Sequence, residues 1–89
     1  MYSIKTSPHI DKIFLELSKK NPKQMEIITK KVDEIIKNPQ RYKNLKAPMN
    51  MCKKVHIDKS FVLLFSVDEK TKTVILEDYD HHDNIYKTK

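Results

Sequence analysis

The spacing of apolar residues predicts one strand and two helices in the first part of the chain. Residues 2–6 alternate between polar and apolar side chains, which is the pattern of a short strand. In the two stretches that follow, apolar residues recur every three or four positions, and each stretch starts with a capping residue and a proline, at Ser7-Pro8 and Asn21-Pro22. We expect the first helix to end near Lys20 and the second at Asn38, since a residue that precedes proline disfavours the helical conformation.

Three further strands are predicted in the second part of the chain, after a loop over residues 39–50. They cover, in order, residues 51–57, 61–67 and 73–79. The middle strand is almost continuously apolar, as expected of a central strand that is covered on both faces. The sequence therefore predicts one α+β domain over residues 1–89, of order β-α-α-β-β-β, in which a helical hairpin packs on one face of a small, mainly antiparallel sheet.

The two faces of this sheet can be assigned by matching apolar positions across turns at 58–60 and 68–71. The matching predicts four pairs on the face that meets the helices: Val55 with Leu63, Ile57 with Phe61, Val74 with Phe65 and Leu76 with Leu63. The opposite face would then carry Lys54, His56, Val62, Leu64, Ser66, Ile75, Glu77 and Tyr79. Such a mixed face is either a docking surface or an ordinary solvent face that the C-terminal tail partly covers, and the pattern leaves both open.

Charge is distributed unevenly along the chain, which carries 18 Lys and Arg against 12 Asp and Glu, a net charge of +6. Residues 41–59 hold six cationic side chains against one acidic residue, whereas residues 60–86 hold two against six. A basic segment beside an acidic one favours a surface that binds a polyanion such as nucleic acid. The competing explanation is a generally lysine-rich proteome, which composition does not exclude.

Several kinds of protein are excluded by what the sequence lacks. A single cysteine, Cys52, excludes an intrachain disulfide framework and a cysteine-based zinc site, and it is better interpreted as a filler of its strand than as a nucleophile. The lack of glycine excludes every glycine-dependent phosphate loop. No apolar run reaches the ~20 residues of a membrane span, and the N-terminus carries no secretory signal, so we expect a cytoplasmic protein without a membrane partner.

The histidines are the strongest candidates for chemistry. His82 and Tyr86 are four positions apart, so one helical turn would place them side by side. An imidazole can donate or accept a proton near neutral pH, and a phenol beside it could orient a phosphate. The adjacent His81 and His82 do not face one metal ion easily, and no zincin spacing occurs, so we predict no metal site and no cofactor. The alternative interpretation places these residues in a surface tail without a catalytic role.

Four short strings stand in an order that is typical of one known family. The segment from Pro39 to Leu45-Lys46 is similar to that family's proline-to-Leu-Lys entry into the sheet, and Lys54-Val55-His56 stands where the family tends to show Arg-x-Arg. Residues 61–65 stand where the family has Tyr-Arg followed by an apolar run, and residues 81–86 are similar to its closing His-Arg-x-x-(Val/Ile)-Tyr. With the order of the elements, these strings resemble the RelE/ParE toxin superfamily, in its RelE-like, archaeal-type branch.

This resemblance implies the toxin of a type II toxin–antitoxin system. Such a toxin cleaves messenger RNA in the ribosomal A site by attack of a 2′-hydroxyl on the neighbouring phosphate, without a metal, and a cognate RelB-like antitoxin inhibits it. The partners would be that antitoxin, the ribosome and messenger RNA. The matching positions assign acid–base catalysis to His82 and Tyr86, with His56, and catalytic phosphate stabilisation to Lys54. The phosphate-binding set would be Arg41, Lys43, Lys46, Lys53, Lys54 and Lys59.

The chain departs from the family that it resembles at positions that usually hold arginine, which are Lys54, His56, Val62 and His82 here. A lysine lacks the bidentate fork of arginine, and Val62 carries no charge at all. Two alternatives therefore stay open. One is a ParE-like, non-nucleolytic inhibitor of a topoisomerase, and the other is a catalytically weakened member that binds only its antitoxin or nucleic acid.

Overall fold

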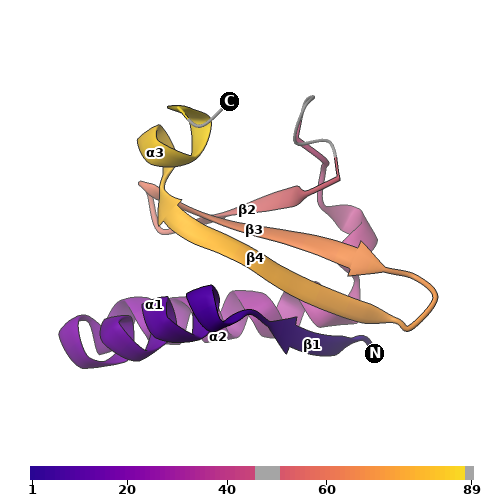
Figure 1. Ribbon diagram of the computed structural model, residues 1–89, viewed down its shortest axis with the longest axis horizontal. Helices are drawn as coiled ribbons and strands as arrows, with labels where there is room; N and C mark the ends of the chain where they lie inside the picture. Colours follow the sequence, from indigo (N-terminus) through magenta and orange to yellow (C-terminus); the bar gives the residue numbers. More distant parts are fainter. Residues whose placement is uncertain (46–50, 88–89) are drawn as a thin grey trace.

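Two helices cover one face of a four-stranded sheet, and a third, short helix lies on the other side (Figure 1). This computed structural model describes residues 1–45 and 51–87, with side chains as far as residue 85. The helices are α1 (Pro8–Lys20), α2 (Pro22–Lys37) and α3 (His82–Lys87), with a 3₁₀ turn, η1, at Pro39–Arg41. The strands are β1 (Ser3–Thr6), β2 (Lys53–Ile57), β3 (Phe61–Asp68) and β4 (Thr73–His81). The predicted α+β class and order β-α-α-β-β-β are confirmed, and α3 and η1 are additions to that order.

Ser7 and Asn21 cap the two long helices, as their positions before proline predict. The Ser7 Oγ accepts a hydrogen bond from the Ile10 N–H at 3.2 Å, and the Asn21 Oδ1 accepts one from the Gln24 N–H at 3.2 Å. Each bond satisfies an N–H group that has no partner within its own helix. Within the described part of the chain, none of the helices combines the length and the apolar character that crossing a membrane requires.

The sheet has the strand order β1-β4-β3-β2, in which β1 runs parallel to β4 and the other two pairings are antiparallel. The mainly antiparallel sheet that the sequence predicts is therefore confirmed. Its helix-facing side is the main core, where buried residues of α1 and α2 meet buried residues of the three long strands. The members of this core are Ile10, Ile28, Ile35, Val55, Ile57, Leu63, Phe65, Val74, Leu76 and Tyr79.

The register between β2 and β3 is the predicted one, with Val55 opposite Leu63 and Ile57 opposite Phe61. The predicted register between β3 and β4 is wrong by two residues. Val74 pairs with Val67 rather than Phe65, and Leu76 pairs with Phe65 rather than Leu63. The cause is the turn, which occupies residues 69–72 instead of 68–71, so that Asp68 pairs with Thr73. A shift by two preserves the alternation of faces, and Val74 and Leu76 still face the helices.

An irregularity between Leu64 and Phe65 changes the face of β4 beyond that point. Tyr79 was predicted on the open face, and this prediction is wrong: Tyr79 pairs with Leu63, and its side chain lies in the main core with 5% exposure. Its ring stacks on Phe61 with centroids 5.4 Å apart, and its hydroxyl accepts a hydrogen bond from the buried Gln24 amide at 2.7 Å. Burial raises the pKa of the Tyr79 hydroxyl, which keeps it protonated.

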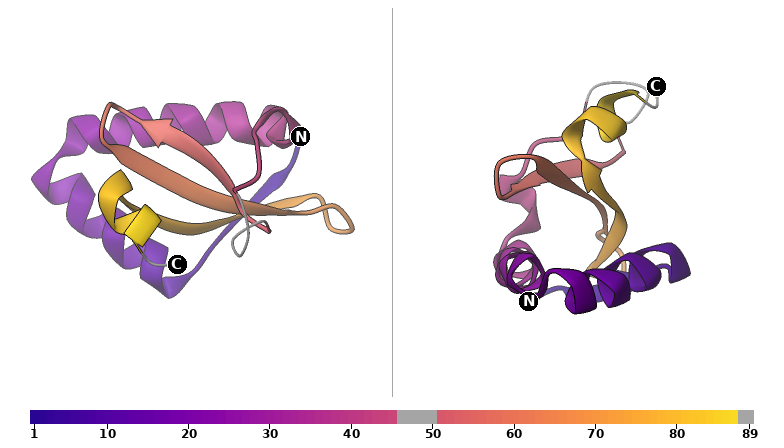
Figure 2. Two further views of the ribbon diagram at one scale, coloured as in Figure 1. Left: turned by 90° about the horizontal axis from the view of Figure 1, so that it is seen from above. Right: turned by 90° about the vertical axis from the view of Figure 1, so that its left-hand side faces the viewer.

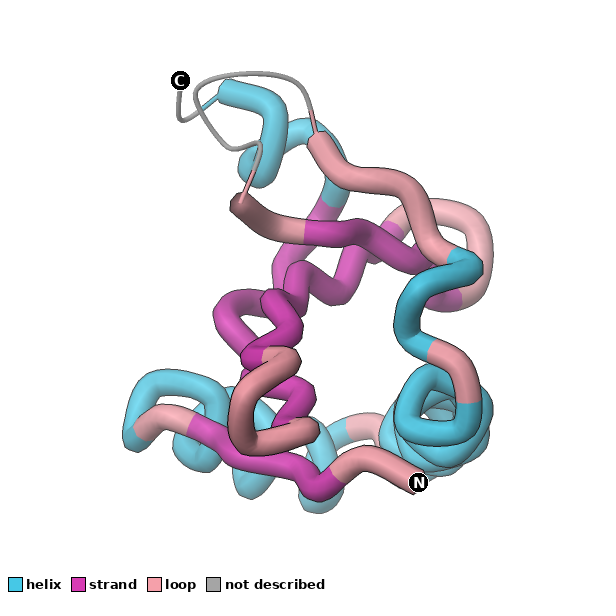
Figure 3. The backbone as a smooth tube through the Cα atoms, turned by 90° about the vertical axis from the view of Figure 1, so that its right-hand side faces the viewer, coloured by secondary structure: helices cyan, strands magenta, loops and turns pink. Residues whose placement is uncertain are grey.

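The second face of the sheet is partly covered by α3, which lies on the side away from α1 and α2 (Figures 2 and 3). Val62, Leu64 and Ile85 form a separate buried cluster on this side, with exposures of 0%, 2% and 3%, and Leu45 packs against it. β3 is therefore buried on both faces, as its continuous apolar run predicts. Of the two interpretations of this face, the structure supports coverage by the C-terminal tail over Val62 and Leu64.

Replacing Tyr79 with phenylalanine should destabilise the fold by about 1–3 kcal/mol, because the buried Gln24 amide would lose its hydrogen-bond partner. The free energy of unfolding from a urea titration measures this change. The double variant Tyr79→Phe with Gln24→Leu should recover part of the loss, since both polar partners are then removed. If Tyr79→Phe alone unfolds at the same urea concentration as the parent protein, the Gln24–Tyr79 bond contributes nothing to stability.

Candidate functional site

The position of His82 is fixed by two contacts of the segment in which it lies. Its backbone N–H donates a hydrogen bond to the Ser60 carbonyl at 2.8 Å, which ties the start of α3 to the turn between β2 and β3. Three residues further on, the buried Ile85 packs on Val62 and Leu64. The His82 side chain itself is 42% exposed. The sequence thus builds an accessible imidazole on a segment that both a backbone bond and an apolar contact hold in place.

β2 brings Lys54 and His56 to the face of the sheet that carries α3. Lys54 pairs with Leu64 and His56 with Val62, so both alternate with the core residues Val55 and Ile57. On the other side of β3, Asp80 pairs with Val62, two residues before His82. His56 and His82 therefore lie at the same end of the sheet, next to the turn at residues 58–60. These two predicted catalytic histidines thus share one end of this face, and Lys54 lies on the same face two residues before His56.

Predicted phosphate-binding residues lie on β2, which is an edge strand of the sheet, and in the described segments before and after it. Lys59 is exposed in the turn that follows β2, one position before Ser60. Arg41 and Lys43 are exposed in the segment that precedes β2, and the Lys43 carbonyl accepts a hydrogen bond from the Lys54 N–H at 3.4 Å. We call Arg41, Lys43, Lys54 and Lys59 the basic edge.

The remaining predicted site residues are Lys53, Lys46 and Tyr86. Lys53 precedes Lys54 in β2, so the two side chains point to opposite faces of the sheet. The Lys53 ammonium donates hydrogen bonds to the Tyr42 carbonyl at 3.0 Å and to the Asn44 Oδ1 at 2.8 Å, and these bonds hold the segment before β2 in place. Lys46 lies outside the described residues, as does the side chain of Tyr86. The backbone of α3 does place positions 82 and 86 one helical turn apart, as predicted.

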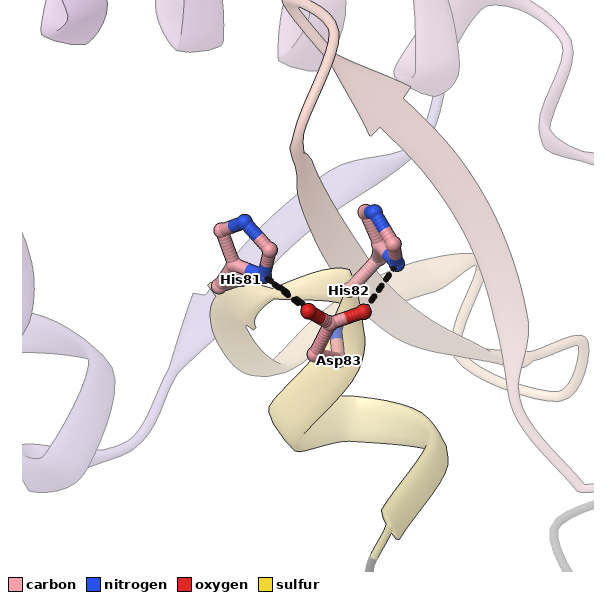
Figure 4. Close-up of side chains that lie close together, drawn as sticks. All are labelled: His81, His82 and Asp83. Carbon is pink, nitrogen blue, oxygen red and sulfur yellow. Dashed lines mark hydrogen bonds and ion pairs between the residues drawn. The ribbon is translucent and has the colours of Figure 1, made fainter.

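His81, His82 and Asp83 lie together at the junction of β4 and α3 (Figure 4). The two imidazole rings stack with centroids 4.8 Å apart and an interplanar angle of 27°. The Asp83 carboxylate lies between them, with Oδ1 3.0 Å from the His82 Nδ1 and Oδ2 3.7 Å from the His81 Nδ1. The sequence-based view that adjacent histidines point apart assumes a continuous strand. Here β4 ends at His81, so the alternation of side chains ends there too.

Asp83 is the residue that sequence reasoning missed at this site. Its carboxylate approaches both imidazoles, and its backbone N–H donates a hydrogen bond to the His81 Nδ1 at 3.2 Å. The signal available in the sequence is the string of two histidines followed at once by an acidic residue, just after a predicted strand. The Phe61 ring also supports the His81 ring, which it meets edge-on with the two ring centroids 5.6 Å apart.

Two other features of the same face offer no catalytic chemistry. Burial raises the pKa of the Cys52 thiol, and the Glu77 carboxylate raises it further, so Cys52 is not an activated nucleophile. A shallow depression of about 560 Å³ lies beside it, and Asp68, Glu69 and Glu77 contribute three carboxylates to its lining. Negative side chains there oppose the approach of a phosphate. The basic edge is the feature whose charge suits a polyanion.

Comparison with known proteins finds relatives of this chain by sequence. No family model matches the chain. It is 58% identical over 89 residues, covering 100% of this chain and 95% of the relative, to a protein of Methanocaldococcus jannaschii that is provisionally named toxin RelE4. It is also 63% identical over 86 residues, 97% of this chain and 100% of the relative, to an uncharacterized protein of Methanosarcina mazei.

The fold is similar to that of a solved toxin. A chain in the crystal structure of the intact E. coli RelBE toxin–antitoxin complex matches this chain with a TM-score of 0.75. The match covers 91% of this chain and 96% of that chain, at 19% sequence identity. Identity at this level supports the shared fold, including the sheet and helices described above.

Replacing Ile85 with alanine should detach α3 from the sheet, because a helix of six residues is not stable by itself. Loss of a buried isoleucine costs about 2–5 kcal/mol. Amide hydrogen exchange should show faster exchange in α3, with β3 and α2 still protected. The control variant Leu15→Ala removes a side chain that is 59% exposed, and it should change stability by no more than about 0.5 kcal/mol. Unchanged protection of α3 in Ile85→Ala would show that this contact does not hold the helix.

Proposed function

Because the chain belongs to the RelE family of toxins from toxin–antitoxin systems, we propose that it is an endoribonuclease that cleaves messenger RNA on the ribosome. The observation that carries this proposal is the position of His82. Its imidazole is accessible and anchored at the end of the sheet face along which the basic edge runs. An accessible imidazole on the same face of the sheet as cationic side chains suits chemistry on a phosphodiester.

The proposed reaction is a transfer within the RNA strand. A 2′-hydroxyl attacks the neighbouring phosphorus, the new 2′-O–P bond forms as the P–O5′ bond breaks, and the products are a 2′,3′-cyclic phosphate and a 5′-hydroxyl. One group must take the proton of the 2′-hydroxyl, and another must supply a proton to the leaving O5′. We assign the role of base to His82. We assign the role of acid either to Tyr86, whose position in α3 is one helical turn after His82, or to His56, which lies at the same end of the sheet.

Cations on the basic edge would stabilise the negative charge that develops on the phosphate. Lys54 is the nearest in sequence to His56, and Lys59 lies in the turn whose Ser60 carbonyl holds His82. Lysines act as point charges and lack the two-pronged geometry of arginine, so they position a phosphate less strictly. The ribosome would supply the missing orientation, because holding the reacting groups in place lowers the barrier without further catalytic residues.

The proposed partners follow from the same assignment. We propose an antitoxin of the RelB type that is acidic where it crosses the basic edge, in line with the toxin–antitoxin complex formed by the E. coli protein of the same fold. Opposite charges across such an interface mainly raise the rate of association. Since messenger RNA and ribosomes are the proposed substrate and site of action, the cytoplasm is the proposed location.

Replacing His82 with alanine should slow ribosome-dependent cleavage of messenger RNA by about 10²–10⁴-fold, the usual contribution of a general acid or base. Primer extension on messenger RNA bound to purified ribosomes measures the rate. The matched control is His9→Ala, since His9 is an exposed histidine on α1 that pairs with Asp78 at 3.0 Å. Normal cleavage by His82→Ala would remove His82 from the mechanism. Growth arrest by the parent protein without any cleavage would favour the topoisomerase inhibitor or a protein that only binds.

Replacing Lys54 with alanine should weaken binding to ribosomes carrying messenger RNA, and it should reduce the slope of log affinity against log salt by about one phosphate contact. The melting temperature should change little, because Lys54 is half-buried and lies outside the main core, so its replacement removes no core packing. Lys12→Ala, on the exposed side of α1, is the matched control with the same change in net charge. An unchanged slope in Lys54→Ala would show that Lys54 contacts no phosphate.

A further inference from the structure

The atoms of His81, His82 and Asp83 that could bind a metal ion converge at the start of α3. One ligand atom from each residue can be chosen so that all three lie within 4.8 Å of one another. Nitrogen and oxygen ligands around a tetrahedral Zn²⁺ lie ~3.3 Å apart, since each is ~2.0–2.1 Å from the metal. The Asp83 Oδ1 lies 3.0 Å from the His82 Nδ1 and the Asp83 Oδ2 lies 3.7 Å from the His81 Nδ1, so each carboxylate oxygen is near this separation from one imidazole. Small rotations of exposed side chains would close the site.

The surrounding contacts hold these side chains ready for a metal. The His81 Nδ1 accepts a hydrogen bond from the Asp83 N–H, so this nitrogen carries its lone pair on the side of Asp83, and a bound ion would replace that N–H as its partner. The His81 ring rests edge-on against Phe61, and the His82 backbone is bonded to the Ser60 carbonyl. Metal-ligating histidines need such support, because second contacts fix the ring orientation.

Local charge at this end of the chain also favours a cation, although the protein as a whole carries +6. No lysine or arginine occurs between Lys72 and Lys87, whereas this stretch contains several acidic residues. Asp80 lies next to the cluster, where its carboxylate accepts hydrogen bonds from the His81 N–H at 2.7 Å and the Asn84 amide at 3.1 Å. A divalent ion would neutralise the combined negative charge of Asp80 and Asp83.

We propose that His81, His82 and Asp83 bind one divalent transition-metal ion of the Zn²⁺ class. Two imidazoles and one carboxylate suit zinc, copper or nickel, whereas magnesium and calcium prefer sites made of oxygen atoms. Three protein ligands leave room in the coordination sphere for water. A consequence that rests on the proposed function is inhibition: an ion bound to His82 occupies the lone pair of the assigned base, so RNA cleavage stops when the site fills.

The binding test uses the full chain without a histidine tag. Calorimetric titration with ZnCl₂ should show one site, and Co²⁺ should give the visible absorption of a tetrahedral complex. NMR should show the imidazole nitrogens of His81 and His82 shifting on addition of Zn²⁺. His81→Ala and Asp83→Asn should each weaken binding by about 10-fold or more. His9→Ala and Asp33→Asn are the matched controls and should bind as the parent does, since His9 and Asp33 lie on α1 and α2.

Two results would overturn the metal site: no saturable binding at millimolar Zn²⁺, or equal binding by the parent and the double variant His81→Ala with Asp83→Asn. A separate arm measures RNA cleavage first with EDTA and then with Zn²⁺. Cleavage in EDTA that Zn²⁺ stops, at the concentration that fills the site, supports inhibition, whereas undiminished cleavage at full occupancy rejects it. If no cleavage occurs even in EDTA, the proposed nuclease activity is wrong, while the calorimetric result for the metal site stands on its own.

Discussion

The candidate site depends above all on the packing of Ile85 on Val62 and Leu64, which acts together with the bond from the His82 N–H to the Ser60 carbonyl. A helix as short as α3 does not form alone in water, so its position must come from tertiary contacts. Burial of one isoleucine stabilises by about 1.5–3 kcal/mol, which is enough to hold a single turn of helix against the sheet. Everything assigned to His82, whether catalysis or metal binding, follows from where this contact places the start of α3.

The two faces of the sheet carry different residues: one packs against α1 and α2, and the other packs against α3. The irregularity between Leu64 and Phe65 turns Tyr79 towards the helices, where it satisfies the buried Gln24, and turns Asp80 to the face that carries α3, where it contacts His81 and Asn84. Without this change of alternation, a tyrosine rather than a carboxylate would accompany α3. The result is a face with opposite charges at its two sides, cationic along β2 and acidic at the end of β4.

The helices and most of the sheet could be predicted from the sequence, because each rests on local signals. Ser7-Pro8 and Asn21-Pro22 cap helices through bonds to nearby residues, and the pairing of Val55 with Leu63 follows from a short turn. The register of β4, the face of Tyr79 and the bracing role of Lys53 depend on the irregularity at Leu64 and on side-chain bonds that periodicity does not encode. Asp83 was missed for the same reason, since its role depends on where β4 ends.

The burial of Val62 limits where a cationic side chain can lie in the candidate site. Val62 stands at a position where the family tends to have an arginine, and here it has no exposed surface and packs beneath Ile85. A cation in that place would be removed from water without a partner, at a cost well above the gain from one apolar contact. A chain that docks α3 in this way therefore cannot also place a cation there, and the phosphate-binding charges that we propose are instead Lys54 on the edge strand and Lys59 in the turn that follows it. In this chain, the packing that fixes the imidazole thus excludes a cation from the central strand beneath α3.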